Sequence, residues 1–152
     1  MSTIIIGEQV VLRQQKAEDA AFFAHWYNDR DIMFKCGFTK ETTIEQEIER
    51  IERRRSLGDE VWFTVTTNDG KIVGETGLLR MWPAWHCTDL SIILPDPATH
   101  GKGYGKETIN LMIDLAFSHF DMNRISIGVV GQNHAALRFY KYVGFKVEGK
   151  QE

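Results

Sequence analysis

The residues best suited to chemistry form a glycine-rich segment at positions 100–106, His-Gly-Lys-Gly-Tyr-Gly-Lys. Three glycines within five residues, after a strand-like segment and at the start of an amphipathic helix, allow successive backbone N–H groups to point toward one ligand. The helix N-terminus adds partial positive charge, and Lys102 and Lys106 add cationic side chains. We therefore expect a phosphate-binding cradle here. The alternative is a plain turn that needs only small residues.

Two familiar nucleotide-binding loops do not fit these residues. A dinucleotide-binding loop has a third glycine where Lys106 stands and opens a βαβ unit, whereas this segment follows antiparallel hairpins. A Walker A loop requires Ser or Thr after Gly-Lys, but Glu107 follows Gly105-Lys106. The loop spacing therefore argues against a nucleotide-binding enzyme. Only preferential binding of ATP or NAD would favour that interpretation again.

The segments before this loop predict antiparallel strands, beginning with a first strand at about 10–12. Residues 61–67 are rich in β-branched and aromatic types, and Asn68-Asp69-Gly70-Lys71 is a strong turn signal. A return strand is expected at 72–79 and another strand at 87–94. Alternating apolar residues predict a strand at 124–130, and a last short strand is expected at 145–147.

Helices are predicted on both sides of these strands. Residues 17–28 carry apolar side chains at helical spacing, and 29–31 break the pattern. Thr42-Thr43 offers an N-cap for a helix that runs to about residue 57. Further helices are expected at 105–120 and 133–142, the last one ending at Gly144. The chain is therefore predicted to be one α/β (or α+β) domain over residues 1–152, a mixed and mostly antiparallel sheet flanked by helices.

Composition limits the classes of function. The chain has 152 residues, 43% hydrophobic and 26% charged, with a formal net charge of −3, which fits one globular domain. That charge argues against a nucleic-acid surface. The basic run 53–55 lies among glutamates, and we interpret it as a solvated helix face.

The cysteines and the N-terminus give further expectations. Cys36 and Cys87 lie far apart, without the spacing of a zinc or redox motif, so no metal is expected. Residues 4–6 are too short a run for a signal peptide or a membrane span. We expect a cytoplasmic protein with reduced thiols and no membrane partner.

Two ordered blocks resemble the GCN5-related N-acetyltransferase (GNAT) superfamily. Residues 100–105 resemble its pyrophosphate loop, Gln/Arg-x-x-Gly-x-Gly/Ala, except that His100 takes the first place. Residues 133–145 are similar to its Asn-x-x-Ala…Leu-Tyr-x-x-x-Gly-Phe segment. Leu12-Arg13, Asp19, Trp26 and Asn28-Asp29 resemble the branch that includes ribosomal-protein N-terminal acetyltransferases and spermidine acetyltransferases. The resemblance covers nearly the whole chain.

The resemblance implies that acetyl-CoA binds in a V-shaped gap between two parallel strands, here at about 89–94 and 125–130. The backbone of Ile92, Ile93 and Leu94 would then pair with the pantetheine arm. The pyrophosphate would be held at His100, Gly101, Lys102, Gly103, Tyr104, Gly105 and Lys106. In the second block, Asn133 would contact the pantetheine arm, which is compatible with its alternative role as a helix N-cap. Ala136 and Phe139 of the same block are further coenzyme-binding candidates.

Attack of an amine on a thioester needs a neutral amine, a polarised carbonyl and protonation of the departing thiolate. The resemblance places Tyr140 near the coenzyme sulfur as general acid, whereas from the residues alone Tyr140 reads as a core aromatic. Asp89, acting through a water, and Glu75 are the candidates for the base. Either carboxylate could instead be exposed or substrate-orienting, and some family members have no obvious base.

The acceptor stays open among a protein N-terminus, a polyamine, an aminoglycoside and another small amine. The acidic balance of the chain slightly favours a cationic one. The alternative function is a non-catalytic acyl-CoA-binding or sensing domain. Trp82 and Trp85 could wall the acceptor site or fill a hydrophobic corner, and we favour the second role.

The last residues carry an expectation about the sheet. Family members usually continue past the Gly-Phe strand into a further strand, whereas this chain ends at Lys150-Gln151-Glu152. We therefore expect either a shortened domain without that final strand or a sheet edge that a second subunit completes. Because unpaired edges favour association, a homodimer is a hypothesis.

Overall fold

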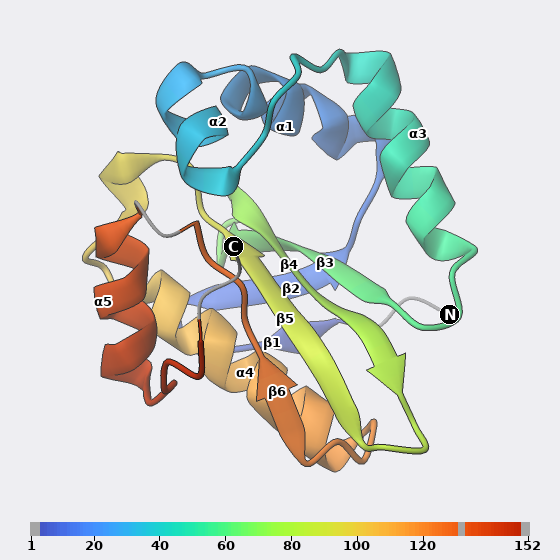
Figure 1. Cartoon of the computed structure of the whole chain (residues 1–152). Coiled ribbons are helices and arrows are strands. Elements are labelled where there is room, and N and C mark those ends of the chain that lie inside the picture. The colour runs from blue at the N-terminus through green and yellow to red at the C-terminus, as the bar shows by residue number, and fades with distance from the viewer. Residues whose placement is uncertain (1–3, 131–132, 150–152) are drawn as a thin grey trace.

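The computed structural model describes residues 4–130 and 133–149. In chain order its elements are β1 (Ile5–Ile6), β2 (Val10–Gln14), η1 (Ala17–Asp19), α1 (Ala20–Tyr27), α2 (Arg30–Cys36), α3 (Ile44–Arg55), β3 (Val61–Thr67), β4 (Ile72–Trp82), β5 (Cys87–Ile93), η2 (Pro97–Thr99), α4 (Tyr104–Ser118), β6 (Arg124–Ser126) and α5 (His134–Val143). Figure 1 shows α1, α2 and α3 grouped at the top of the view and α4 and α5 at the lower left.

The strands form a six-stranded sheet in the order β1-β2-β3-β4-β5-β6. Neighbours pair antiparallel from β1 to β5, and β5 and β6 pair in parallel. The parallel pair requires a crossover connection, which α4 supplies. The predicted mixed, mostly antiparallel sheet with flanking helices is confirmed.

Helices bury apolar side chains against the sheet in two separate clusters. One cluster joins α4, through Ile109 and Met112, to sheet residues such as Leu12 and Leu78. The other joins α1, α2 and α3 through Phe23, Ile32 and Ile51. Each strand alternates its side chains between two faces, so the two clusters occupy opposite sides of the strands that bear the site.

The turn between β3 and β4 lies where its sequence predicts, although β4 runs to Trp82, beyond the expected end at residue 79. Asp69-Gly70 makes the turn, where Gly70 adopts a φ of +91° and donates from its N–H to the Thr67 carbonyl at 3.0 Å. The predicted helix caps are also present: Thr43 accepts from Gln46 N, and Gly144 ends α5 with a φ of +114°.

Two expectations about the elements are wrong, and two further elements were not predicted. The helical pattern breaks before Asp29 as expected, since α1 ends at Tyr27, but Asp29 then caps the unpredicted helix α2, accepting from the N–H groups of Asp31 and Ile32. Residues 5–6 form the edge strand β1. The strand expected at 124–130 ends at Ser126, because β5 and β6 pair only over three positions. Residues 145–147 form no strand.

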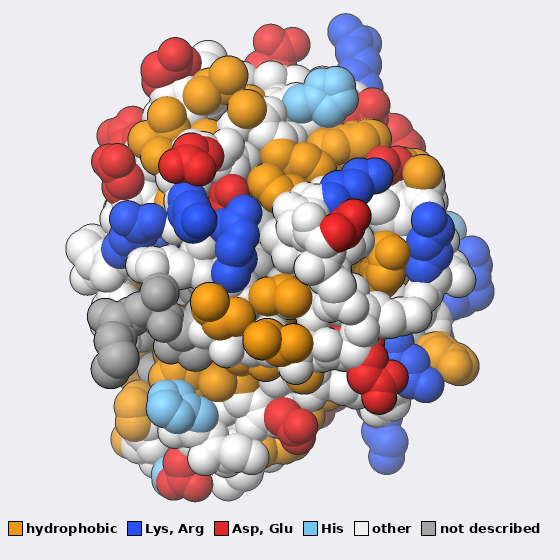
Figure 2. Space-filling view, turned by 180° about the vertical axis from the view of Figure 1, so that it is seen from behind, with side chains coloured by type: hydrophobic (Ala, Val, Ile, Leu, Met, Phe, Trp, Pro, Cys, Tyr) orange, Lys and Arg blue, Asp and Glu red, His pale blue; other side chains and the backbone are white. Residues whose placement is uncertain are grey.

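The surface carries both signs of charge. Figure 2 shows acidic and basic side chains close together, with hydrophobic side chains between them, on the face turned away from the viewer in Figure 1. No helix within residues 4–130 and 133–149 has the length and apolar character needed to cross a membrane.

Candidate active site

The two parallel strands separate at one point of the sheet. Pairing runs from Cys87–Arg124 to Asp89–Ser126 and goes no further. Beyond it, β5 stays hydrogen-bonded to β4 as far as Ile93. The other backbone edge of residues 90–93 therefore faces no strand among the described residues. An extended chain with amides could pair with this edge, as an added strand does.

The loop that follows β5 turns its backbone in a way that only glycine tolerates well. Gly101 and Gly103 have φ values of +77° and +88°, in the left-handed region that costs other residues roughly 1–2 kcal/mol. A Cβ at Gly101 would meet nothing within 4 Å, whereas one at Gly103 would lie 3.1 Å from Gln9 Oε1. Gly101 is therefore required by its backbone conformation and not by crowding. The side on which a Cβ would project is open to a ligand.

The N-terminus of α4 lacks a side-chain cap. Asp29, Thr43 and Asn133 cap α2, α3 and α5 with their side chains, but Gly103 has no side chain to cap α4. The first N–H groups of a helix have no partner within it, and the helix dipole favours an anion there. The geometry fits a pyrophosphate, with Lys102 and Lys106 exposed beside it.

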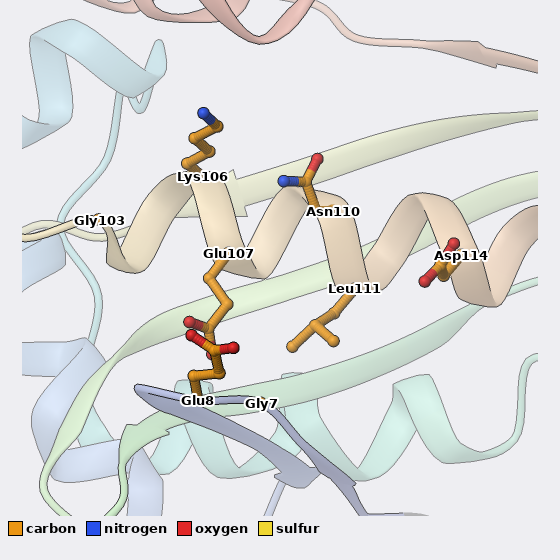
Figure 3. A pocket seen from close by; sticks show the side chains of 8 residues that line it. All are labelled: Gly7, Glu8, Gly103, Lys106, Glu107, Asn110, Leu111 and Asp114. Atoms are coloured by element: carbon orange, nitrogen blue, oxygen red, sulfur yellow. The ribbon is translucent and has the colours of Figure 1, made fainter.

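Glu107 fixes the start of α4 to the edge of the sheet. Its carboxylate accepts from Gln9 N at 2.9 Å and from Val10 N at 3.0 Å. Gly7 makes room for it, since a Cβ there would lie 2.0 Å from Glu107 Oε1. Figure 3 shows Glu107 reaching toward Gly7, while Lys106 points to the other side of the helix. Both residues line a shallow pocket, together with Asn110 and Asp114.

Several of the predicted coenzyme residues lie together at this end of α4. His100 Nε2 lies 2.7 Å from the Leu94 carbonyl oxygen, which joins the loop to the end of β5. A Cβ at Gly105 would lie 3.0 Å from the Phe139 ring, so α5 packs closely on the first turn of α4. The Lys106 ammonium lies 5.1 Å from the centre of the Tyr142 ring. Ile92, Leu94 and Phe139 pack on the same hydrophobic cluster, and Ile93 packs on the opposite one.

Asn133 joins the start of α5 to the end of α2. Its Oδ1 accepts from Ala136 N at 3.2 Å, as an N-cap does. Its Nδ2 donates to the Lys35 carbonyl at 3.3 Å. The alternative role of Asn133 as a helix cap is therefore confirmed, and the same side chain holds α2 beside α5.

Tyr140 packs beside Phe139 and Phe145, with ring centres 5.7 and 6.2 Å away. Burial, followed by the neighbouring Cys36 thiol, raises the pKa of Tyr140 to about 12. Tyr140 is thus both a packed aromatic and a phenol that stays protonated at neutral pH.

The two predicted carboxylates occupy different environments. Asp89 ends the parallel pairing with Ser126 and forms an ion pair with Arg80 at 2.6 Å, in which the side chains are 35% and 65% exposed. Glu75 is 1% exposed. It pairs with Ile93 across the β4–β5 ladder, whereas Leu79 pairs with Asp89, so the two carboxylates lie four positions apart along the strands.

Glu75 is enclosed by donors that the sequence did not reveal. Its Oε1 accepts from Arg54 Nη1 at 2.6 Å and from Gln15 Nε2 at 3.0 Å. Its Oε2 accepts from the Tyr27 hydroxyl and from Arg50, whose Nη1 lies 3.3 Å away. Burial raises the pKa of Glu75, but Arg54, Arg50 and Tyr27 outweigh burial and hold it below the usual value. No lone pair is left free for a substrate.

The interpretation of the basic run as a solvated face is wrong for Arg54. Its side chain is 13% exposed, and its guanidinium lies 3.4 Å from the centre of the Trp62 ring. Glu47, Arg50, Ile51 and Arg54 follow the i, i+3, i+4, i+7 spacing of one helix face. That spacing is the sequence signal for a buried helix face. It is easily missed because three of the four residues are charged.

The expectation that Trp82 and Trp85 fill a hydrophobic corner is also wrong. Their rings stack with centres 5.4 Å apart, and the residues are 55% and 72% exposed.

Within the described part of the chain, no group of three or more His, Cys, Asp or Glu side chains could hold a metal ion.

Comparison with known proteins gives this geometry a family. The sequence profile described as "Acetyltransferase (GNAT) domain" matches residues 9–146. Spermidine N(1)-acetyltransferase of Vibrio cholerae is 25% identical over 145 residues, which cover 95% of this chain and 83% of that protein. YjcK of Bacillus subtilis is 29% identical over 111 residues, which cover 70% of this chain but 61% of the relative.

Solved structures share the fold. The crystal structure of Vibrio cholerae spermidine N-acetyltransferase in complex with CoA and spermine superposes with a TM-score of 0.83 at 24% identity, over 94% of this chain and 84% of the other. The matched profile spans both the glycine loop and α5, the two blocks that carry the site. The chain therefore belongs to the GNAT family of acetyltransferases, which take the acetyl group from acetyl-CoA.

Proposed function

We propose that this protein transfers the acetyl group of acetyl-CoA to a primary amine by direct attack in a ternary complex. The observation that carries the proposal is the opening of β5 from β6 at Asp89 and Ser126, next to a glycine loop and an uncapped helix N-terminus. These features provide a strand edge for the pantetheine amides and a cradle for the pyrophosphate. His100, Gly101 to Lys106, Asn133, Ala136 and Phe139 are the proposed coenzyme contacts.

Tyr140 is the proposed general acid. The amine nitrogen attacks the thioester carbonyl carbon, the C–S bond breaks, and the sulfur takes the phenolic proton of Tyr140. The proton lost by the amine passes through a water to the base, and solvent returns a proton to the phenol. Because the pKa of Tyr140 is about 12 and that of a free thiol about 8.5, this proton transfer is unfavourable by itself, and reprotonation of the phenol completes it.

Asp89 is a better candidate than Glu75 for the base that accepts the amine proton through a water. Asp89 lies where the strands part and is partly exposed. Glu75 is buried, and arginines, Gln15 and Tyr27 already donate to both of its oxygens. A backbone N–H near Ile92 or Ile93 would polarise the thioester carbonyl.

The acceptor class is proposed from chemistry and from relatives. A polyamine is supported by the relative that acetylates spermidine, and a protein amine by another relative, alpha/beta-tubulin-N-acetyltransferase 9 of Drosophila melanogaster, 24% identical over 92% of this chain and 76% of its own length. The net charge of −3 favours a cationic amine by attraction. A homodimer and a cytoplasmic location remain hypotheses, which light scattering and cell fractionation would test.

The test is release of free thiol from acetyl-CoA with a panel of polyamines, aminoglycosides and N-terminal peptides. Loss of a positioned acid typically costs 10²–10⁴-fold, so Tyr140→Phe is expected to lower kcat at least about 10²-fold with one acceptor class. Tyr142→Phe is the matched control, since Tyr142 lies on the same helix, is 72% exposed and keeps its ring under Lys106. Turnover that Tyr140→Phe leaves unchanged would reject the proposed acid. Tight acetyl-CoA binding without any turnover would favour a sensing domain.

A further inference from the structure

The buried carboxylate of Glu75 joins four parts of the chain at one point. Arg50 and Arg54 come from α3, Tyr27 from the end of α1, and Gln15 from the residue after β2. The guanidinium of Arg50 also lies 5.5 Å from the centre of the Tyr27 ring. A carboxylate with both oxygens occupied in this way fixes the position of its donors and does not take protons from a substrate.

This cluster lies against the strand end assigned to the coenzyme. Glu75 is directly opposite Ile93 in the ladder, and the preceding Gly74 is so close that a Cβ there would lie 2.1 Å from the Ile93 carbonyl oxygen. The Ile93 side chain packs on the cluster that contains Tyr27. A displacement of Tyr27 would therefore change the packing of Ile93 at the end of β5.

A second route runs from the same tyrosine to the other wall of the site. The Tyr27 ring lies 5.1 Å from the ring of Phe38, whose N–H bonds to the Met33 carbonyl at 2.8 Å and closes the end of α2. One turn back, the Lys35 carbonyl accepts from Asn133 Nδ2, at the start of the helix that carries Tyr140. Tyr27 thus belongs to the cluster on which the end of β5 packs and contacts Phe38, which closes the end of α2 beside the start of α5.

We propose that Tyr27 and Glu75 are positioning residues, which hold the end of β5 and the α2–α5 contact at the separation that the coenzyme requires. The proposal rests on the proposed function, because it assigns this spacing to the acetyl-CoA site. Breaking the Tyr27–Glu75 bond should weaken coenzyme binding and leave the chemical step nearly unchanged, since neither residue reaches the reacting atoms.

Thr64→Val is a close control for Tyr27→Phe. Thr64 donates at 2.7 Å to Asp19, a buried carboxylate that also pairs with an arginine, Arg13. Thr64 is even the ladder partner of Glu75. Each substitution removes one buried hydroxyl that donates to an arginine-paired carboxylate on the same sheet face, but only Tyr27 also contacts Phe38 at the end of α2.

The experiment measures the Kd of coenzyme A by calorimetry, with kcat and KM for acetyl-CoA and the melting temperature, for wild type and both variants. Tyr27→Phe should raise Kd and KM about threefold or more with kcat within about twofold. Thr64→Val should leave Kd, KM and kcat near the wild-type values, although its melting temperature should be close to that of Tyr27→Phe. Phe38→Leu, which removes the next contact and spares Glu75, should raise Kd in the same way.

Equal effects of Tyr27→Phe and Thr64→Val, or an unchanged Kd in Tyr27→Phe, would overturn the proposal. A fall in kcat with an unchanged Kd would also overturn it. Failure of the proposed function is distinguishable, because wild type would then bind coenzyme A without acetylating any amine, and the comparison of Kd values would still stand. Should Tyr27→Phe not fold, the Kd of Phe38→Leu decides.

Discussion

At the scale of single residues, burial distinguishes a carboxylate that positions its neighbours from one that is proposed to accept a proton. Glu75 and Asp89 are both carboxylates on neighbouring strands, yet one is saturated with donors and the other is partly exposed beside Arg80. Their sequence neighbourhoods do not distinguish them, because the donors to Glu75 come from positions 21 to 60 residues away. A residue type and a strand position therefore predict a candidate base, while burial decides its role.

The pH dependence of kcat/KM follows from these assignments. Because burial raises the pKa of Tyr140 to about 12, the acid stays protonated and kcat/KM should rise with pH as the amine is deprotonated, without a fall due to Tyr140 below about pH 11. Asp89→Asn should lower kcat/KM most at neutral pH, where an amine proton must be removed, and least at alkaline pH. Steady-state rates at a series of pH values measure both effects.

Two outcomes would contradict these residue assignments. An alkaline fall in kcat/KM that disappears in Tyr140→Phe would mean that its pKa is much lower than the burial of the ring implies. An equal loss for Asp89→Asn at every pH would assign Asp89 to structure or to acceptor binding, and would leave the enzyme without a side-chain base.

At the scale of elements, the sequence predicts best where the signals are local. The turn at Asp69-Gly70 and the caps at Thr43 and Asn133 depend on neighbours within a few residues, and all three are present. Asp29 misled because an Asp-Arg-Asp run is polar enough to resemble a loop, although Asp at an N-cap equally starts a helix. Alternation at 124–130 gave no sign of where the strand ends, since pairing depends on β5.

The glycines of the coenzyme loop offer a test at this scale. Gly101→Ala should weaken coenzyme A binding because alanine resists a φ of +77°, at a cost of about 1–2 kcal/mol. Gly105→Ala should also weaken it, since its Cβ would lie 3.0 Å from the Phe139 ring and force α5 away from α4. Calorimetric Kd values measure both effects.

Gly58→Ala is the control for this pair, because Gly58 lies between α3 and β3, a Cβ there meets nothing within 4 Å, and its φ lies outside the left-handed region. Unchanged affinity in Gly101→Ala would show that the loop does not need its left-handed turn to bind the pyrophosphate. Unchanged affinity in Gly105→Ala would show that α5 can move without loss, and that Phe139 is not a coenzyme contact.

At the scale of the whole molecule, two buried carboxylates tie the α1–α3 layer to the sheet. Asp19 joins η1 to β2 and β3 through Arg13 and Thr64, and Glu75 joins β4 to α1 and α3. The sequence predicts the layers from apolar periodicity, but it does not reveal these polar links. These links bear on the proposed function because the same layer carries α2, whose Lys35 carbonyl accepts from Asn133 at the start of α5.

Acid stability should report these links. Burial raises the pKa of each carboxyl, yet the donors outweigh it: Arg13 and Thr64 lower the pKa of Asp19, and Arg54 and Arg50 that of Glu75. A carboxyl whose folded-state pKa is depressed stabilises the fold above its unfolded value, about 3.9 for Asp and 4.3 for Glu, and loses that contribution as pH falls through the folded-state pKa. The free energy of unfolding in urea should therefore be level at neutral pH and fall below about pH 4.5.

Glu75→Gln should be less stable than wild type at pH 7, by about 3–5 kcal/mol because two arginines lose their buried partner, and its stability should fall less steeply in acid. Asp69→Asn is the control: the pKa of Asp69 is also lowered, by its bond to Thr67, but Asp69 is fully exposed in a turn, where solvent screening leaves such an interaction little weight in stability. Its acid profile should match wild type. An acid profile of Glu75→Gln as steep as that of wild type would mean that other carboxylates, and not the link at Glu75, hold the two layers together at neutral pH.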